Sequence, residues 1–463
     1  MKYISTRGSG TSATFDEVVL TGLAPDGGLF VPDSIPDVTD VLPQWKHLSY
    51  RDLAAQIFGI FTDLPSGDIE RIIARSYASF EEPDVVRVVK VGELHVLELF
   101  HGPTLSFKDI ALQFLGNMFE RLLAESGSEL NILAATSGDT GSAAIHAVRG
   151  KARQRIFVMH PKGRISPSQE RQMTSVLDEN VYNLAVAGTF DDCQRIMKEL
   201  FNDLEFKCRH SLGAVNSVNW GRILAQIVYY FYGAFRVMQA TGSDRVRFSV
   251  PTGNFGDIFA GYVAYRMGLP IDRLVLATNE NDILARFFKS GVYSIGTVKE
   301  SVSPSMDIQV ASNFERYLFY EVGGDGKMVS SLMKDLAANG RFSMATPSGE
   351  PHERIIVAGS GNTGATLKTI RETYVRSGYL MDPHTAVGAY VGSNYLDRGS
   401  PMIALATAHP AKFSGTIAAA LGSSIASHNT IDRLTGLPTR CRLVAPNVGE
   451  VRSFLEEALS GNK

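Results

Sequence analysis

Lys108 is the residue of this sequence whose surroundings most favour side-chain chemistry. It follows a turn that contains Gly102 and Pro103, and we expect it to begin a helix. A positive charge is unfavourable at a helix N-terminus, and the neighbouring Phe107 and Ile110 predict apolar surroundings, so both effects lower the pKa of the amine. A neutral lysine amine can form a Schiff base with a carbonyl group. The alternative is an ordinary solvated lysine in the first turn of a helix.

Three glycine-rich turns are candidate anion sites. Each follows an apolar strand pattern and precedes a helical one, in ILAATSGDTGSAAI (132–145), FSVPTGNFGDIFAGYVA (248–264) and RIIVAGSGNTGATLKTI (354–370). Glycine lets backbone N–H groups approach an anion closely, and the helix behind the turn favours negative charge. Glycine is also common in such turns for steric reasons alone, so a single turn leaves both interpretations open. None of the three matches a P-loop or a complete dinucleotide-binding pattern.

The elements that must position these residues follow a regular alternation. From residue 131 onward, short β-branched runs alternate with apolar residues at helical spacing. The runs are NILAAT, IFVMH, VYNLAVA, VRFSVPT and RLVLATN. Such alternation is typical of a mostly parallel sheet with helices on its faces, so an α/β fold is predicted.

Some helix starts have local signals of their own. The segment SPSQ (166–169) predicts an N-cap serine, a proline at the first helical position and a capping partner. Thr189 and Asp192 predict a second capping box. Cys193 falls on the apolar face of the helix that follows, so we expect it in the core rather than as a nucleophile.

Composition divides the chain into two regions. Residues 1–90 hold the turn-rich APDGGLFVPDSIPDV and short helical patterns, but no glycine-rich strand-to-helix turn, so we expect a separate N-terminal subdomain. Residues 91–463 hold the lysine and the glycine-rich turns. Within this region, residues 290–352 are rich in Ser, Gly, Lys and Glu, around EVGGDGKMVSS and ATPSGEPHE. We expect them to form an inserted excursion before the sheet resumes at IIVAG and IALAT.

The charge balance and the cysteines exclude several classes of protein. The 463 residues include 45 Lys and Arg against 48 Asp and Glu, a formal charge of −3 with no basic block. A nucleic-acid partner is therefore not expected, and a small molecule is favoured. The three cysteines form no C-x-x-C pair and cannot all pair with one another, which favours a reducing, cytoplasmic compartment. The ten histidines show no metal-ligand spacing, so we predict no metal site.

Neither a secretory signal nor a membrane partner is expected. The start, MKYISTRGSG, has no apolar stretch of the secretory type. The longest suspicious run, Ile223–Phe235, has only 13 residues and includes Gln226, whereas a spanning helix needs about 20 apolar residues. We therefore predict a buried core helix at this position.

Five motifs in a fixed order resemble the threonine synthase family. They are HGPTLSFKD around Lys108, TSGDTGSAA, NSVNWGRI, PTGNFGD and DPHTAVG, and the likeness extends from STRG and APDGGLFVP to TAHPAKF. The family consists of pyridoxal-phosphate (PLP) enzymes of the tryptophan synthase β type, fold type II. The resemblance implies two open, mostly parallel αβα domains with the cofactor in the cleft between them, plus an N-terminal subdomain.

The resemblance also implies an activity and a cofactor site. The family converts O-phospho-L-homoserine and water into L-threonine and phosphate, by γ-elimination followed by β-addition of water. Lys108 would bind PLP as a Schiff base and shuttle protons. Thr407 would face the pyridine nitrogen, although a strand-end cap is the alternative for this residue. The cofactor phosphate would be held by Gly253, Asn254, Phe255, Gly256 and Asp257.

Further residues would contact the substrate. By resemblance, the turn that holds the substrate carboxylate contains Ser137, Gly138 and Thr140, and Asp139 would lie near the 3-oxygen of the cofactor. The substrate phosphate would be bound by Ser217, Asn219 and Arg222. For Arg222 the alternative is a guanidinium that snorkels at the head of the apolar helix 222–240.

Two other functions and several details remain open. A PLP-dependent dehydratase or phospho-lyase would stop at elimination, and a non-catalytic protein on the same fold would only bind its ligand. The resemblance is compatible with a monomer or a homodimer. His101 could contact the cofactor or only pack within its turn.

Overall fold

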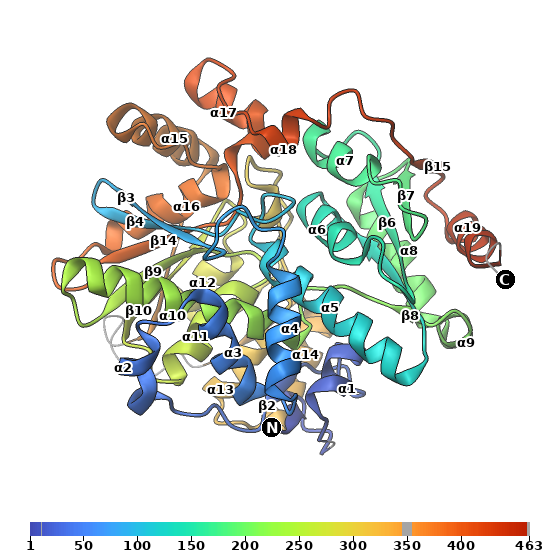
Figure 1. Cartoon of the computed structure of the whole chain (residues 1–463), viewed down its shortest axis with the longest axis horizontal. Coiled ribbons are helices and arrows are strands. Elements are labelled where there is room, and N and C mark those ends of the chain that lie inside the picture. Colours follow the sequence, from blue (N-terminus) through green and yellow to red (C-terminus); the bar gives the residue numbers. More distant parts are fainter. Residues whose placement is uncertain (11, 345–353, 461–463) are drawn as a thin grey trace. The chain divides into compact units, whose positions relative to one another are not determined.

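The computed structural model describes residues 1–10, 12–344 and 354–460 (Figure 1). The chain forms two compact units, each built from two stretches of sequence. The first contains Met1–Ala111 and Ser217–Ala426, and the second contains Leu112–Asn216 and Ser427–Lys463. The long helix α5 (Lys108–Ser126) begins in the first unit and continues in the second.

A six-stranded sheet forms the centre of the first unit. Its strand order is β13-β10-β9-β14-β4-β3, and all neighbouring pairs are parallel except the antiparallel pair β3 and β4. The strands are β13 (Ile356–Ser360), β10 (Ile271–Thr278), β9 (Val246–Pro251), β14 (Met402–Ala406), β4 (Leu94–Glu98) and β3 (Arg87–Val91). Because β9, β14 and β4 are parallel neighbours, the segments that follow them leave the sheet at the same edge.

Two helices on this sheet carry much of the first unit's core. Helix α10 (Trp220–Thr241) is capped by Asn219 at its start and by Gly242 at its end, and its residues from Trp220 to Phe235 are buried. Helix α11 (Gly256–Arg266) packs against it so closely that a Cβ at Gly261 would lie 2.6 Å from the Tyr230 ring. The predicted buried helix is confirmed. Among the helices that the structure describes, none has the combined length and apolar character needed to cross a membrane.

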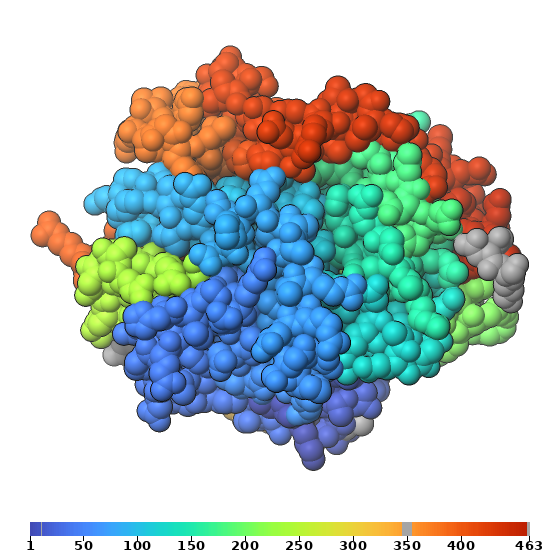
Figure 2. All heavy atoms as spheres, viewed as in Figure 1, coloured from blue at the N-terminus to red at the C-terminus, as the bar shows by residue number. Residues whose placement is uncertain are grey.

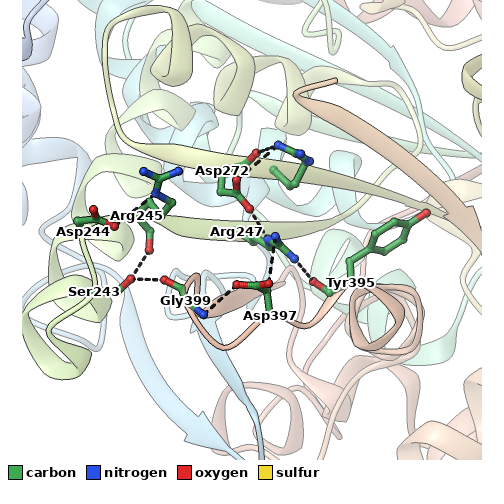
Figure 3. Close-up of polar contacts among 9 residues, drawn as sticks. Ser243, Asp244, Arg245, Arg247, Asp272, Tyr395, Asp397 and Gly399 are labelled. Carbon is green, nitrogen blue, oxygen red and sulfur yellow. Dashed lines mark hydrogen bonds and ion pairs between the residues drawn. The ribbon is translucent and has the colours of Figure 1, made fainter. Parts of the chain in front are cut away.

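The amino-terminal edge of the first sheet is held by surface ion pairs (Figure 3). Arg247 on β9 bonds to Asp272 on β10, donates to the Tyr395 carbonyl at 2.8 Å and lies 3.8 Å from Asp397. A polar hollow of about 480 Å³ beside this network is lined by residues that include Arg245 and Asp272. Ligands of open α/β sheets bind at the opposite, carboxyl edge, so this network is interpreted as structural.

The N-terminal residues and the excursion both belong to the first unit. Helix α3 (Tyr50–Phe61) packs against α10, and Arg236 donates to the carbonyls of Lys46 and Leu48. In Figure 2, the blue N-terminal atoms adjoin the yellow-green ones. The other N-terminal elements are β1 (Tyr3–Ser5), α1 (Phe15–Thr21), β2 (Phe30–Pro32), α2 (Leu42–Trp45) and α4 (Ser66–Ser76). A separate subdomain of residues 1–90, distinct from 91–463, stays a prediction.

The excursion predicted at 290–352 contains regular structure of its own. Short strands β11 (Val292–Ser294) and β12 (Arg341–Ser343) pair antiparallel, and helices α13 (Phe314–Glu321) and α14 (Gly326–Asn339) lie between them in the sequence. The segment ATPSGEPHE (345–353) lies outside the described residues. The first unit ends with α15 (Thr363–Ser377), α16 (Pro383–Gly392) and α17 (Ser414–Leu421).

The second unit is a smaller parallel α/β structure. Its sheet has the order β15-β7-β6-β5-β8, with β15 (Arg442–Val444), β7 (Val181–Val186), β6 (Gln154–Pro161), β5 (Leu130–Ala135) and β8 (Leu212–Gly213). Its helices include α6 (Asp139–Val148), α7 (Pro167–Thr174), α8 (Phe190–Asn202) and α19 (Val448–Ser460). The capping boxes predicted at Ser166 and Thr189 are both present. Cys193 is buried in the core beneath this sheet, as predicted.

Candidate active site

Three of the predicted segments leave neighbouring strands of the first sheet at its carboxyl edge. The turn before Lys108 follows β4, Thr407 follows β14, and the Gly253 loop follows β9. Since the order of these strands is β9-β14-β4, Thr407 comes from the strand between the other two. Motifs about 150 residues apart in the sequence therefore meet at one edge of one sheet.

Lys108 is the first residue of α5, as predicted, and its side chain is largely buried against an aromatic ring. The residue is 9% exposed, and Nζ lies 4.9 Å from the centre of the Phe107 ring. The Phe107 N–H donates to the Thr407 carbonyl at 2.8 Å. This bond connects the residue before Lys108 to Thr407, the residue predicted to face the pyridine nitrogen. Thr407 itself is buried. The backbone thus fixes the spacing between the lysine and this threonine.

The Gly253–Asp257 loop leads directly into α11. Phe255 adopts a left-handed backbone with φ 65° at the N-cap position of this helix. A Cβ at Gly253 would lie 2.7 Å from the Ser305 carbonyl oxygen, so a side chain has no room there. The Asn254 carbonyl accepts from the backbone N–H and the side-chain amide of Asn313, at 3.0 and 3.1 Å. The excursion therefore holds this loop in place at the N-terminus of an eleven-residue helix, a position suited to an anion.

The carboxyl group of Asp257 is buried against two tyrosines of α10. Oδ1 accepts from the Tyr229 hydroxyl at 2.5 Å and from the Tyr230 hydroxyl at 2.9 Å, whereas the buried Oδ2 has no partner among the described residues. Burial raises the pKa of Asp257 to about 6, and the nearby Lys108 opposes this shift. The carboxyl group is thus held by hydroxyl donors. An acidic residue can therefore be part of a loop that is predicted to hold a phosphate.

Arg222 lies in the first turn of α10 with its side chain buried. It is 5% exposed, and its buried Nε has no hydrogen-bond partner among the described residues. Burial lowers the pKa of Arg222 to about 10. A guanidinium head that snorkels into water is therefore not what the structure shows. A buried cation without an anionic partner is costly, and it is a natural site for an anionic ligand.

The two other residues predicted at the substrate phosphate also have roles within the chain. The Asn219 side chain caps α10 by accepting from the Gly221 N–H at 3.0 Å, and it donates to the Val19 carbonyl at 2.8 Å. The Ser217 carbonyl accepts from the Asn313 side chain. These bonds position the start of α10 and hence Arg222. Direct substrate contacts from Ser217 and Asn219 stay predictions.

The turn predicted to hold the substrate carboxylate belongs to the second unit. It connects β5 to α6, and the Thr136 hydroxyl accepts from the N–H groups of Gly138 and Gly141 at 3.0 and 2.8 Å. Asp139 accepts from the Gln169 side chain at 2.8 Å, and Gly138 has φ 134°, a conformation that residues with a side chain rarely adopt. The roles predicted for Ser137, Gly138, Asp139 and Thr140 stay predictions.

His101 is bound within its own turn. Its Nε2 lies 3.0 Å from Glu98 Oε2, and the other oxygen of Glu98 accepts from the Tyr379 hydroxyl at 2.9 Å. The ring also packs on Phe100. These bonds hold the ring within its turn, and a contact of His101 with the cofactor is not tested by them.

Sequence reasoning missed several buried polar residues around these segments. They are Thr104, Asp109, Tyr229, Tyr230 and Lys412. Asp109 and Lys412 lie inside the quoted motifs HGPTLSFKD and TAHPAKF, so a charged residue beside apolar ones was the available signal. The two tyrosines gave no such signal because they lie in a run typical of a core helix.

Comparison with known proteins identifies relatives along almost the whole chain. A family model for pyridoxal-phosphate dependent enzymes matches residues 87–332, and models for the N terminus and the C-terminal part of threonine synthase match residues 2–77 and 385–455. The threonine synthase of Methylobacillus glycogenes is 43% identical over 99% of this chain and 100% of its own length. That of Saccharomyces cerevisiae is 45% identical, over 90% of this chain and 89% of its own.

A solved structure agrees over nearly the whole chain. The crystal structure of PLP-bound threonine synthase from Brucella melitensis superimposes with a TM-score of 0.94 at 43% identity, covering 99% of each chain. The fold and the lysine turn therefore define a PLP-dependent enzyme of fold type II, as the motifs predicted. Within this class, the chain belongs to the threonine synthase family.

Proposed function

We propose that this enzyme converts O-phospho-L-homoserine and water into L-threonine and inorganic phosphate, with PLP as its cofactor and Lys108 as its base. The observation that supports this most is the convergence of Lys108, the Gly253–Asp257 loop and Thr407 at the ends of three adjacent strands. The full-length similarity to threonine synthases supports the same substrate.

The residues at the strand ends fit PLP. The loop lies at a helix N-terminus, and the carboxyl of its one acidic residue is held by Tyr229 and Tyr230. Lys108 would bind the cofactor aldehyde, the loop N–H groups its phosphate, and the Thr407 hydroxyl its ring nitrogen. Bound in this way, the cofactor would supply a conjugated ring that delocalises negative charge from the substrate Cα.

Lys108 then performs the proton transfers. It takes a proton from the substrate Cα, a second proton leaves Cβ, and the phosphate departs from Cγ. Cγ then receives a proton and becomes the methyl group, water adds at Cβ and gives up one proton, Cα receives a proton, and threonine is released. A single amine can serve these steps because Cα and Cβ are adjacent atoms.

Arg222 recognises the substrate phosphate in this proposal. A buried guanidinium forms charge-assisted bonds to phosphate oxygens, and such bonds are stronger where water is excluded. The same contact stabilises the phosphate as it leaves. Recognition of a dianion therefore does not require a basic protein surface, in agreement with the formal charge of −3.

Product analysis tests this function. The purified holoenzyme is supplied separately with O-phosphohomoserine, phosphothreonine and threonine, and Lys108→Ala is the inactive control. We expect threonine and phosphate in equal amounts from O-phosphohomoserine alone, and no turnover by the variant. 2-Oxobutyrate as the main product would instead identify a dehydratase or phospho-lyase, and a colourless chain that takes up no PLP would identify a non-catalytic binder.

A further inference from the structure

A buried carboxylate and a buried lysine meet directly beside the Lys108 turn. Asp109 and Lys412 are each 0% exposed, although neither has a part in the proton transfers or in phosphate binding. They meet at Thr104, the residue that follows Gly102 and Pro103. The Thr104 carbonyl accepts from Lys412 Nζ at 2.6 Å. Its N–H and hydroxyl donate to the two oxygens of Asp109, at 2.8 and 2.7 Å.

Stability alone is a weak reason for this arrangement. Removing two charges from water is costly, and buried ion pairs are frequently no more stable than apolar residues of the same size. Burial raises the pKa of Asp109 to about 6, while Thr104 and Lys412 oppose this shift. What the three residues do provide is geometry, because every polar atom of Thr104 has a partner whose direction is fixed.

The three residues hold the turn before Lys108, which contains an unfavourable backbone conformation. Leu105 is a buried, non-glycine residue with φ 58°, in the left-handed region. The next residues pair with the segment after β14: Ser106 forms an antiparallel bridge with Ala408, and the His409 N–H donates to the Leu105 carbonyl at 3.1 Å. The turn therefore depends on bonds outside itself to keep a conformation that leucine rarely adopts.

The network connects both segments that carry proposed cofactor contacts. Asp109 follows Lys108 in α5, and successive helical residues project about 100° apart, so one holds the turn while the other projects elsewhere. Lys412 lies in the 3-10 helix η4 (Pro410–Phe413), shortly after Thr407. There is no room for a side chain at Gly102, where a Cβ would lie 2.5 Å from the Asp109 Cβ.

We propose that Asp109, Thr104 and Lys412 are positioning residues that set the direction of the Lys108 amine relative to Thr407. The proposal rests on the proposed function, since it takes Lys108 as the residue that binds PLP. It assigns a role to Asp109 and Lys412, two charged residues of the quoted motifs that take no part in the proposed reaction steps. Loss of the network should misdirect the amine while the Gly253–Asp257 loop, on another strand, keeps its anion site.

The test separates covalent capture from cofactor binding. Lys412→Met is compared with wild type, with Lys412→Arg as the conservative variant and Lys151→Met as the matched control. Lys151 donates a hydrogen bond of the same length as Lys412 does, 2.6 Å, but to the side-chain oxygen Asn117 Oδ1, and it lies in the second unit. Each cofactor-free protein is mixed with PLP, and the rate of the visible absorbance change reports attachment to Lys108. Affinity for 4′-deoxypyridoxine phosphate, which has no aldehyde, reports binding without attachment.

We expect attachment to slow by about tenfold or more in Lys412→Met, since small misplacements of a reacting group have large effects on rate. Affinity for the aldehyde-free analogue should stay within about threefold of the wild-type value, because the Gly253–Asp257 loop is intact. On loading with PLP, kcat should fall more than KM rises, Lys412→Arg should recover part of the rate, and Lys151→Met should match wild type. Equal losses of attachment and of analogue affinity, or wild-type attachment in Lys412→Met, would overturn the proposal.

A milder variant keeps the test decisive if Lys412→Met does not fold. Thr104→Val removes only the hydroxyl donor to Asp109 and preserves the shape of the side chain, and it should slow attachment by a smaller factor with the analogue affinity unchanged. Wild-type attachment in a folded Thr104→Val would contradict the proposal. Failure of the wild type to make threonine would overturn the proposed function alone, because the attachment rate does not depend on turnover.

Discussion

Asp257 is buried, with one carboxyl oxygen bonded to two tyrosines and the other without a partner among the described residues, so its charge should affect stability. Its pKa is about 6 in the folded chain and about 4 when unfolded. Between these values the unfolded chain releases a proton that the folded chain keeps. The free energy of unfolding therefore falls as pH rises from 4 to 6, by roughly 3 kcal/mol for this group, and the loss is complete above pH 6.

Asp257→Asn should remove this part of the pH dependence. The amide oxygen can still accept from Tyr229 and Tyr230, and no charge is buried above pH 6. We expect the cofactor-free variant to be more stable than wild type at pH 8 and similar to it near pH 4, measured by urea unfolding. The contribution of Asp109 is common to both proteins and cancels in the comparison. Parallel pH profiles for the two proteins would show that Asp257 does not carry the buried charge.

Arg222 should behave as a binding residue rather than a stabilising one. Arg222→Met removes a buried cation that has no ion pair among the described residues, so stability should be unchanged or higher. KM for O-phosphohomoserine should rise by about 10- to 100-fold, from the loss of charge-assisted bonds worth roughly 1.5–3 kcal/mol, with little change in PLP affinity. Arg236→Met, on the same helix but bonded to carbonyls of residues 46 and 48, should leave KM unchanged. An unaltered KM in Arg222→Met would remove this residue from the phosphate site.

At the scale of elements, the loop between β9 and α11 depends on close packing with the excursion. Gly253→Ala would bring Cβ within 2.7 Å of a backbone oxygen, whereas Gly256→Ala would meet the Asn313 side-chain nitrogen at 3.2 Å. We expect PLP affinity to fall by about tenfold or more in the first variant and much less in the second, because backbone yields less than a side chain. Absorbance titration measures both affinities. The reverse order would mean that Ser305 does not set the position of the loop.

The sequence predicts elements better than contacts between them. Alternating β-branched runs predicted strands β5, β6, β7, β9 and β10, and polar signals predicted the caps of α7 and α8, because these depend on neighbouring residues. The hydrogen bond between Asp257 and Tyr229 joins two helices, so no local sequence pattern predicts it. The positive φ of Leu105 is equally hidden, since leucine does not favour it.

At the scale of the molecule, the N-terminal residues are part of the first unit's core. The rings of Tyr3 and Phe61 lie 5.8 and 6.0 Å from that of Trp220, and Arg7 pairs with Glu315 at 2.8 Å. A chain that lacks residues 1–77 would expose Trp220 at the start of α10, beside Arg222. We expect this chain to be insoluble or to bind a hydrophobic dye, with no PLP uptake. A folded, PLP-binding product would establish that the N-terminal residues are an independent subdomain.

The boundaries of the two units could not be predicted from the sequence. Each unit combines two distant stretches, and α5 runs from one unit into the other without interruption. No change of composition marks residues 111, 216 or 426, because the chain passes between units within a helix and within short connections. The family motifs nevertheless predicted which residues gather at the carboxyl edge of the first sheet, since parallel strands bring the segments after them together.

Oxygen labelling tests the central claim most directly. The enzyme is supplied with O-phosphohomoserine in ¹⁸O-enriched water, and both products are analysed by mass spectrometry. If phosphate leaves by cleavage of the carbon–oxygen bond and water then adds at Cβ, threonine carries one heavy oxygen in its hydroxyl group and the phosphate carries none. Labelled phosphate accompanied by unlabelled homoserine, or 2-oxobutyrate in place of threonine, would contradict the account.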